Sequence, residues 1–400
     1  MAKKMEGVNS NTNILTLTED NIQHDTDLDK ANLIANTIAS NSSNANYSRT
    51  FQLHKTEMET KWKTEINSSA ELTDIDAVNG KFQIYELTAA IKQCNRNSAP
   101  GNDDITYHLL KKLPNLPLQK LLEFFNRLWN REQIVPEWKE SIIIPIHKPG
   151  ADKSNPQSYR PIALTSALCK IQERLITTRL TWLLEKNNII NPNQSAYRKH
   201  RSTLDHLIRL QDNINKSINT KGTTIAIFFD FSKAFDMLWK NGLIYKMKQC
   251  GIYGKILNWI EDFLSDRKIR VNVNNTLSDS HTLENGTPQG SVISPILFLL
   301  IINDFPSTPN SNISTSLFAD DSAIWTSGRN TQQLVKILKP RVEEIVSWCN
   351  SWGFKLNENK TTAVIFSNSR IARNSSVNID INGKTIATAK TAKFLGLTFE

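Results

Sequence analysis

Apolar residues recur along this chain at two spacings, and each spacing predicts a different kind of element. Apolar positions three and four residues apart predict helices, and short apolar runs bounded by turn residues predict strands. The predicted helices cover 162–185, 202–219, 239–264 (with a break at Gly251 and Gly254), 291–303 and 331–348. The predicted strands cover 141–146, 223–229, 269–273, 282–284 and 361–366. Strands and helices do not alternate regularly and no internal repeat is visible, so we expect an α+β fold with a mixed or antiparallel sheet backed by helices.

Proline and glycine refine two of these elements. Pro145 cannot donate a backbone hydrogen bond, so it favours an edge position for the strand at 141–146. Asn382-Gly383 stands between short apolar stretches and is a strong signal for a β-hairpin.

The first 80 residues differ in composition from the rest. Residues 1–48 are rich in Asn, Ser, Thr and Asp, which predicts a flexible or weakly helical leader with one amphipathic stretch at 28–38. Residues 1–80 hold seven Lys and Arg against twelve Asp and Glu, a net charge of −5, so residues 81–400 carry +14 to reach the formal total of +9. The positive charge of residues 81–400 favours binding to a polyanion, although many basic surfaces serve only to keep a protein in solution.

The cysteine spacing and the length of the apolar runs indicate the cellular compartment in which the protein is expected. The four cysteines form no CxxC pair and no zinc spacing, which favours a reducing environment, and the seven histidines lack metal spacing as well. No apolar stretch follows the charged N-terminus, and the longest apolar run, 292–302, is too short to cross a bilayer. We therefore expect an intracellular protein, cytoplasmic or nuclear, with no membrane partner and no secretion.

Two clusters of acidic residues carry the clearest chemical signal. Asp230 and the pair Asp320-Asp321 each follow apolar residues of strand character, so their carboxylates should emerge at the edge of a buried sheet. Two-metal phosphoryl transfer needs such acids from separate segments. Because neighbouring residues of a flat strand point to opposite faces, Asp320 and Asp321 can cooperate only at a bend, and a hairpin tip supplies one. A solvated Asp-Asp turn is the alternative for an isolated pair.

Further polar segments accompany these acids. Gly286–Ser291 is a glycine-rich turn before a helix, where the backbone could approach a ligand closely. No GxxxxGK[ST] motif is present, so a P-loop nucleotide hydrolase is not indicated. Lys148 and Arg160 could clamp a triphosphate, and Lys360 could donate a proton to a leaving pyrophosphate, although each could also be an ordinary surface cation. Asp236 is interpreted as a surface or capping acid.

Seven blocks in order along the chain resemble one enzyme family. They are 158–164 (SYRPIAL), 194–198 (QSAYR), 229–236 (FDFSKAFD), 286–291 (GTPQGS), 318–321 (FADD), 356–361 (LNENKT) and 394–397 (FLGL). Together they resemble the reverse transcriptase of non-LTR (LINE-type) retrotransposons, close to the jockey group. The resemblance runs from about residue 82 to the last residue and leaves out the leader.

The resemblance implies a right-hand polymerase, with a leader at 1–80, an N-terminal extension and fingers at 81–222, and a palm at 223–400. It also implies roles for individual residues. The implied metal ligands and catalytic residues are Asp230, Asp320 and Asp321, with Lys360 as proton donor. The implied nucleotide contacts are Arg160, Lys148, Phe235 (a gate against the ribose 2′-OH), Gln289 and Gly290. The implied primer grip is Phe394, Leu395 and Gly396.

The function implied is that of a nucleotidyltransferase, an RNA-directed DNA polymerase. Such an enzyme adds dNTPs to a primer 3′-OH on an RNA template, with two Mg²⁺ ions, or Mn²⁺ in their place, as cofactors and with template RNA and DNA primer as partners. The chain ends just after the 394–397 block, so we expect the thumb to be absent, and no segment resembles an endonuclease. Asp104 and Ala196-Tyr197 depart from the family's common residues. The alternatives are a group II intron maturase and a truncated, catalytically silent remnant that only binds RNA.

Overall fold

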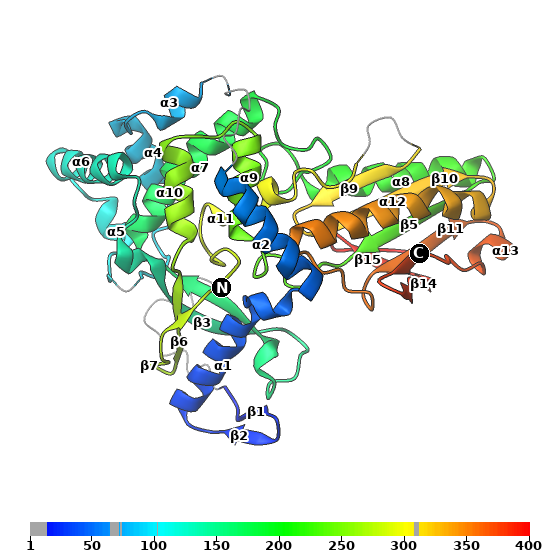
Figure 1. The fold of residues 1–400 in the computed structure, drawn as a ribbon, viewed down its shortest axis with the longest axis horizontal. Coiled ribbons are helices and arrows are strands. Elements are labelled where there is room, and N and C mark those ends of the chain that lie inside the picture. The colour runs from blue at the N-terminus through cyan, green and yellow to red at the C-terminus, as the bar shows by residue number, and fades with distance from the viewer. Residues whose placement is uncertain (1–13, 65–71, 73, 102, 308–311) are drawn as a thin grey trace. The chain divides into compact units, whose positions relative to one another are not determined.

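The chain forms two compact units (Figure 1). The computed structural model describes residues 14–64, 72, 74–101, 103–307 and 312–400. Unit 1 comprises Met1–Tyr47, Glu59–Ile189 and Phe235–Leu297, and unit 2 comprises Ser48–Met58, Ile190–Ala234 and Phe298–Glu400. The chain therefore enters each unit more than once. Long-range contacts and not chain order define these units, so the expected boundaries at residues 80 and 222 stay a prediction.

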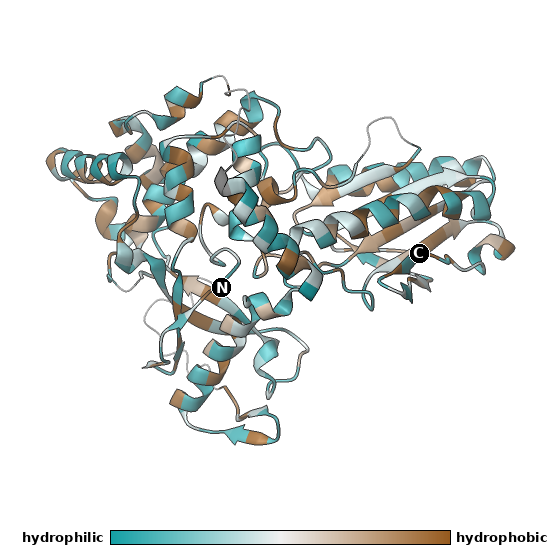
Figure 2. Ribbon diagram, viewed as in Figure 1, coloured by the Kyte–Doolittle hydropathy of each residue, from teal (hydrophilic) through white to brown (hydrophobic). Residues whose placement is uncertain are grey.

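Unit 2 is built on a mixed five-stranded sheet in the order β14-β11-β5-β10-β9. Its strands are β5 (Thr223–Phe229), β9 (Ser314–Phe318), β10 (Asp321–Gly328), β11 (Thr362–Ser367) and β14 (Ala387–Ala389). The central strand β5 pairs antiparallel with β10 and β11, and β14 joins β11 in parallel. Every residue of β5 is buried, as expected for a strand with a continuous apolar sequence (Figure 2).

Two long helices cover this sheet. Helix α8 (Thr203–Asn219) places Leu207 and Leu210 in one apolar cluster with Ala226 and Phe228 of β5. Because side chains alternate along a strand, the odd-numbered residues of β5 face the opposite side. Helix α12 (Thr331–Trp352) also packs on β5 and β10. The sheet is thus a buried layer, as the α+β prediction required.

Short hairpins complete unit 2. One hairpin joins β12 (Asp380–Ile381) to β13 (Lys384–Thr385), and the Asn382-Gly383 signal correctly predicted it. Another joins β15 (Ala392–Phe394) to β16 (Leu397–Phe399).

Unit 1 contains a second sheet. Its strands are β3 (Glu140–His147), β4 (Tyr159–Leu164), β6 (Lys268–Val273), β7 (Thr276–Leu277) and β8 (His281–Thr282). β3 lies between β4 and β6, so the prediction of an edge strand is wrong for the strand as a whole. β6 pairs only with residues 140–143, however, and at Pro145 the neighbour is Pro161 of β4. Pro145 thus lies where β3 has no β6 partner on its second side, so a backbone N–H is not needed there.

The N-terminal residues described belong to this sheet's core. They form β1 (Leu17–Glu19), β2 (Ile22–His24) and α1 (Asp27–Asn41), and the last contains the expected amphipathic stretch. Leu17, Leu33 and Ile34 share one buried cluster with Ile143 and Val271. This packing differs from the flexible leader that the polar composition predicted, because a few apolar side chains suffice once a sheet is present to receive them.

The larger helices of unit 1 are α4 (Ile84–Gln93), α6 (Asn115–Arg131), α7 (Ala167–Lys186), α9 (Lys240–Gln249) and α10 (Lys255–Leu264). α7 starts later than the predicted residue 162, because residues 159–164 pair with β3. The remaining helices of the chain are α2 (Arg49–Thr64), α3 (Ile75–Asn79), α5 (Tyr107–Leu110), α11 (Ser294–Ile301) and α13 (Arg370–Arg373), with 3-10 turns at Asn44–Asn46, Pro136–Lys139 and Pro156–Ser158. Across the described ranges, each helix is too short or too polar to span a membrane.

Candidate active site

Asp230 leaves the end of the central strand of unit 2. The last paired residue of β5 is Phe229, which lies opposite Ser322 of β10. The antiparallel register, continued by one position, sets Asp230 opposite Asp321. Acids that are 91 positions apart in the sequence therefore meet at one edge of the sheet because of the strand pairing alone.

The hairpin between β9 and β10 carries the other two acids. Asp321 pairs with Phe318, which leaves Ala319 and Asp320 as a two-residue turn. Ala319 has a φ of 54°, in the left-handed region that tight hairpin turns require. The bend expected between Asp320 and Asp321 is confirmed. Asp320 lies at the tip and Asp321 begins the returning strand.

A buried glutamine holds this turn. Gln194 is 1% exposed, and its Oε1 accepts hydrogen bonds from the backbone N–H groups of Ala319 (3.0 Å) and Ala196 (2.9 Å). The segment around Gln194 also pairs with Leu317 of β9. Gln194 lies in one of the seven sequence blocks, but no local pattern indicated that its side chain supports Asp320.

The pKa values of Asp320 and Asp321 are both raised above the ordinary value of an aspartate. Burial raises the pKa of Asp320, and the Asp230 carboxylate raises it further. Burial also raises the pKa of Asp321, followed by the charges of Asp320 and Asp230. A small cavity of about 10 Å³ lies beside Asp320. Its lining residues are Phe231, Phe298, Ile302, Phe305, Leu317, Ala319, Asp320, Ser322 and Phe354.

This donor set suits a divalent metal ion. Hard cations such as Mg²⁺ take oxygen ligands, and a cation would relieve the repulsion among these carboxylates. In the part of the chain that the structure describes, no His, Cys, Asp or Glu side chains converge as a ready-made cage of three or more ligands. Neighbouring carboxylate charges raise the pKa values of Asp320 and Asp321. The strand register holds the backbones of these acids in place, and their side chains could rotate onto an ion.

The loop that carries Lys360 is attached to Asp230. The Asn357 N–H donates to the carbonyl oxygen of Asp230 (2.8 Å), and the Asp230 N–H donates to Oγ1 of the fully buried Thr361 (3.3 Å). Lys360 itself is exposed. The fold therefore brings the backbone of the Lys360 loop to that of Asp230, while the ammonium group lies at the end of an exposed side chain. Thr361 is a second supporting residue that sequence reasoning missed.

The turn 286–291 in unit 1 carries Gln289 and Gly290. The Gly286 N–H donates to the Leu238 carbonyl (2.9 Å), and the Thr287 N–H donates to the Phe235 carbonyl (3.1 Å). Gly286 has a φ of +82°, and a Cβ there would lie 2.5 Å from the Asp236 carbonyl oxygen. Only glycine tolerates this combination without strain. Phe235 and the turn are thus parts of one hydrogen-bonded arrangement.

Two further contacts fix the turn. The carbonyl of Gln289 accepts from the Ala163 N–H of β4 (3.0 Å). Glu173 of α7 is fully buried, and its Oε2 accepts from the N–H groups of Val292 (2.6 Å) and Ile293 (3.2 Å) as well as from the Ser291 hydroxyl. The carboxylate thus caps the segment leading into α11 from another helix, and no spacing in the sequence indicated this role.

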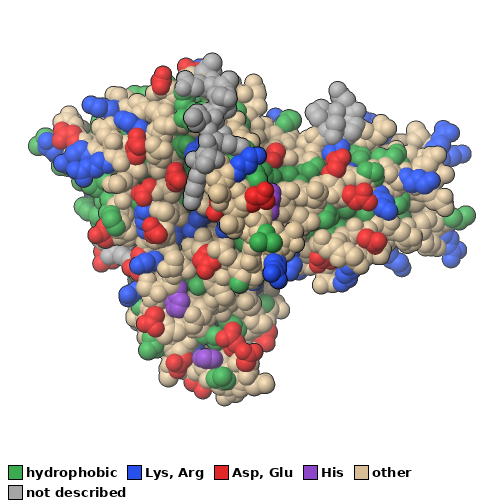
Figure 3. Space-filling model, in the orientation of Figure 1, with side chains coloured by type: hydrophobic (Ala, Val, Ile, Leu, Met, Phe, Trp, Pro, Cys, Tyr) green, Lys and Arg blue, Asp and Glu red, His purple; other side chains and the backbone are tan. Residues whose placement is uncertain are grey.

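The expected phosphate contacts lie on the β3–β4 hairpin of unit 1. Arg160 is exposed on β4 and pairs in register with Ile146. Lys148 is half-buried, and its Nζ donates to the Gln157 carbonyl (2.7 Å). Arg160 is therefore available to a ligand, whereas Lys148 already has a partner. On the face drawn in Figure 3, basic and acidic side chains are interspersed and form no continuous basic stripe.

The expected primer grip lies on the β15–β16 hairpin. Leu395 and Gly396 form its turn, both with positive φ. Phe394 is 4% exposed and packs against Phe228, with ring centroids 5.2 Å apart. Its ring belongs to the core, whereas Gly396 of the turn, Leu397, which is 52% exposed, and the flanking Lys393 and Thr398 are open to solvent.

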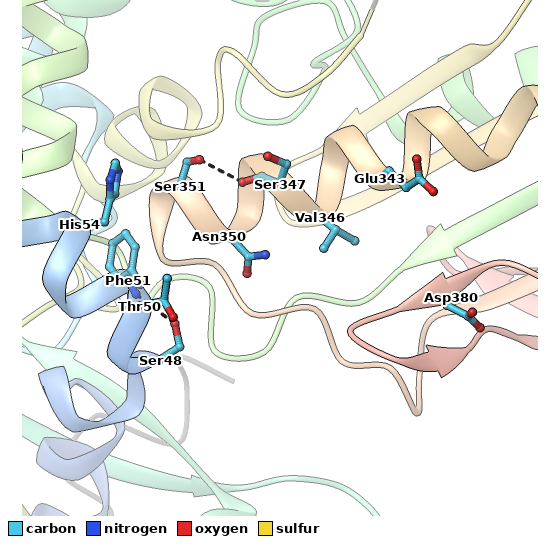
Figure 4. A pocket seen from close by; sticks show the side chains of 10 residues that line it. All are labelled: Ser48, Thr50, Phe51, His54, Glu343, Val346, Ser347, Asn350, Ser351 and Asp380. Carbon is cyan, nitrogen blue, oxygen red and sulfur yellow. Dashed lines mark hydrogen bonds between the residues drawn. The ribbon is translucent and has the colours of Figure 1, made fainter.

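A larger hollow in unit 2 lies apart from the acids. It has a volume of about 560 Å³ and contains none of the predicted site residues (Figure 4). Its lining residues are Ser48, Thr50, Phe51, His54, Glu343, Val346, Ser347, Asn350, Ser351 and Asp380. The larger hollow therefore does not coincide with the acids of the candidate site.

Comparison with known proteins agrees with these observations. A family model described as reverse transcriptase (RNA-dependent DNA polymerase) matches residues 146–399. The probable RNA-directed DNA polymerase from transposon BS of Drosophila melanogaster is 30% identical over 329 residues, which cover 80% of this chain and 36% of that protein. The RNA-directed DNA polymerase from mobile element jockey of the same species is 28% identical over 323 residues, which cover 79% of this chain and 35% of that protein.

A third relative, the probable RNA-directed DNA polymerase from transposon X-element of Drosophila melanogaster, is 29% identical over 322 residues, 80% of this chain and 35% of that protein. The chain thus spans about a third of the length of these relatives. The matched region includes all seven sequence blocks and every predicted site residue. The chain belongs to the reverse transcriptase (RNA-dependent DNA polymerase) family and is similar, within it, to the enzymes of jockey-like non-LTR retrotransposons.

Proposed function

We propose that this chain is the catalytic part of an RNA-directed DNA polymerase that extends a primer 3′-OH with dNTPs on an RNA template. The observation that carries the proposal is the register that sets Asp230 opposite Asp321, with Asp320 at the adjoining hairpin tip. Family membership and the names of the relatives support it. In this proposal the sheet of unit 2 corresponds to the palm, and the β3–β4 hairpin of unit 1 belongs to the fingers.

Asp230, Asp320 and Asp321 would hold the divalent ions, two Mg²⁺ in the proposal. Bound there, the ions would promote attack by the primer hydroxyl and neutralise charge on the nucleotide's phosphates. Gln194 and Thr361 keep the backbones of Asp320 and Asp230 in place, so that the carboxylates need only side-chain rotation to converge. Asp320, half-buried beside the apolar cavity, lies in surroundings less polar than water, which strengthens its electrostatic interactions.

The other predicted residues take supporting roles. Lys360, on the loop bonded to Asp230, would give a proton to the departing pyrophosphate. Arg160 would bind the triphosphate, and its exposure supports this role better than it does for Lys148. Phe235 would exclude a ribose 2′-OH, with Gln289 and Gly290 near the nucleotide and template. The turn Leu395–Gly396 would contact the primer through its backbone.

Replacement of single acids tests the proposal. Asp230→Asn and Asp320→Asn should each abolish Mg²⁺-dependent primer extension, because each removes one charged ligand, and Asp321→Asn should cost less. Asp212→Asn is the matched control, since Asp212 is an exposed acid of the same unit that pairs only with Lys216 on its own helix. Circular dichroism should show an unchanged fold in all four. Near-normal extension by the Asp230 or Asp320 variant would refute the assignment.

A further inference from the structure

Asp236, interpreted from the sequence as a surface or capping acid, has a different place in unit 1. Its Oδ1 accepts a hydrogen bond from Nε2 of Gln289 at 2.7 Å, across 53 positions of sequence. Both side chains are half-buried. The contact forms because the 286–291 turn bonds to the backbone of Phe235 and Leu238, on either side of Asp236.

This contact determines which end of the Gln289 amide faces outward. An ionised carboxylate has acceptors only, so the amide must turn its NH₂ group to Asp236. Its oxygen, Oε1, is then left as an acceptor, and among the residues that the structure describes no group donates to it. The orientation thus follows from the chemistry of the pair.

The backbone beneath Gln289 is held firmly. Ala163 bonds to its carbonyl, and the buried Glu173 caps the residues that follow. Gly290, with a φ of +108°, lies so close to β4 that a Cβ would be 3.1 Å from the Ala163 carbonyl oxygen. The position of Oε1 therefore depends on the side-chain torsions of Gln289, which Asp236 restricts.

The chemistry of nucleic acids narrows the group that Oε1 can meet. Phosphate oxygens are acceptors and would be repelled by it. Paired bases keep one unpaired N–H on each amino group, but that donor is present on some base edges only, so it cannot serve every nucleotide. Sugar hydroxyls remain, and Phe235, the residue expected beside the sugar, belongs to the segment bonded to this same turn.

We propose that Asp236 is a positioning residue that orients Gln289 so that its Oε1 accepts a hydrogen bond from a sugar hydroxyl. The hydroxyl is the 3′-OH of the incoming nucleotide or the 2′-OH of the template. This inference rests on the proposed function, since it assumes that the chain binds nucleotide and template.

Single-nucleotide incorporation distinguishes the two sources. One comparison sets dNTP against 2′,3′-dideoxynucleotide, and the other sets an RNA template against a DNA template of the same sequence. If the 3′-OH of the incoming nucleotide is the donor, Asp236→Ala should lower the preference for dNTP over dideoxynucleotide. If the 2′-OH of the template is the donor, it should lower the preference for RNA over DNA template. Either decrease should be about threefold to tenfold, the range for one hydrogen bond. Asp236→Asn, which keeps an acceptor oxygen but can also rotate, should lie between wild type and Asp236→Ala.

Gln289→Met tests the other member of the hydrogen-bonded pair, because methionine has a similar length to glutamine but no amide group. It should lower the same preference, and the double variant Asp236→Ala/Gln289→Met should lower it no further. Asp212→Ala, which removes an exposed acid of unit 2, should leave both preferences unchanged.

Unchanged preferences in both Asp236 variants, or effects that multiply in the double variant, would overturn the proposal. A uniform loss of rate with both preferences intact would also overturn it, since it would show a merely structural role. If circular dichroism shows Asp236→Ala to be unfolded, Asp236→Asn decides the question. A wild-type chain without any extension would instead refute the proposed function, and the inference with it.

Discussion

Replacement of two glycines by alanine separates the cost of backbone conformation from the cost of close packing. Gly286 has a φ of +82°, and a Cβ there would lie 2.5 Å from the Asp236 carbonyl oxygen and 2.8 Å from that of Phe235. Gly150, in the same unit, has a φ of +76°, and a Cβ there would have nothing within 4 Å. The two positions share a left-handed backbone and differ in their surroundings.

The magnitudes follow from this difference. Alanine in a left-handed conformation costs about 1–2 kcal/mol, and the reduced freedom of the unfolded chain offsets about 0.4–1 kcal/mol of it. Gly150→Ala should therefore lower the free energy of unfolding by about 1 kcal/mol or less. Gly286→Ala meets backbone atoms that cannot rotate away, and the shift it forces should add about 1–3 kcal/mol. We expect its total loss to be about 2–4 kcal/mol.

Urea denaturation followed by far-UV circular dichroism measures both losses against the unfolding transition of the wild-type chain. Gly286→Ala should also slow primer extension, because the same shift moves Gln289 and the backbone bonded to Phe235. If the two variants lose the same stability to within about 0.5 kcal/mol, the close contact at Gly286 carries no energy and the reasoning is wrong.

Three further predictions concern the site and its support. Gln194→Met leaves two buried N–H groups without their acceptor, so it should cost about 2–5 kcal/mol in urea denaturation and reduce extension, while the exposed control Gln157→Met should cost almost nothing. Burial, and secondarily the charge of Arg209, lowers the pKa of His206 from 6.5 to about 4. Between pH 4 and pH 6.5 the unfolded chain therefore binds more protons at His206 than the folded chain does. The free energy of unfolding should fall as the pH drops from 6.5 to about 4, by no more than about 2 kcal/mol after solvent screening. His206→Gln should make the free energy of unfolding depend less on pH in this range. Phe235→Ala should raise ribonucleotide incorporation relative to dNTP incorporation without abolishing synthesis, and an unchanged ratio would show Phe235 to be only a packing residue.

Local pattern in the sequence determined the main elements and the acids. The continuous apolar run at 223–229 predicted β5 with the observed bounds, because a strand buried on both faces needs apolar residues throughout. The pair Asp320-Asp321 predicted a hairpin bend, because only a bend lets adjacent side chains cooperate. Glycine at position 286 likewise indicated a turn with a close backbone approach.

Tertiary structure alone decided what supports these residues. Gln194 lies 125 positions from Ala319, Thr361 lies 131 from Asp230, and Glu173 lies 119 from Val292. A buried polar group must find a hydrogen-bond partner, but which partner it finds depends on which segments the fold brings together. Spacing and propensity describe only neighbours along the chain, so they located the acids of this site and left the residues that hold them in place to be found in the packed structure.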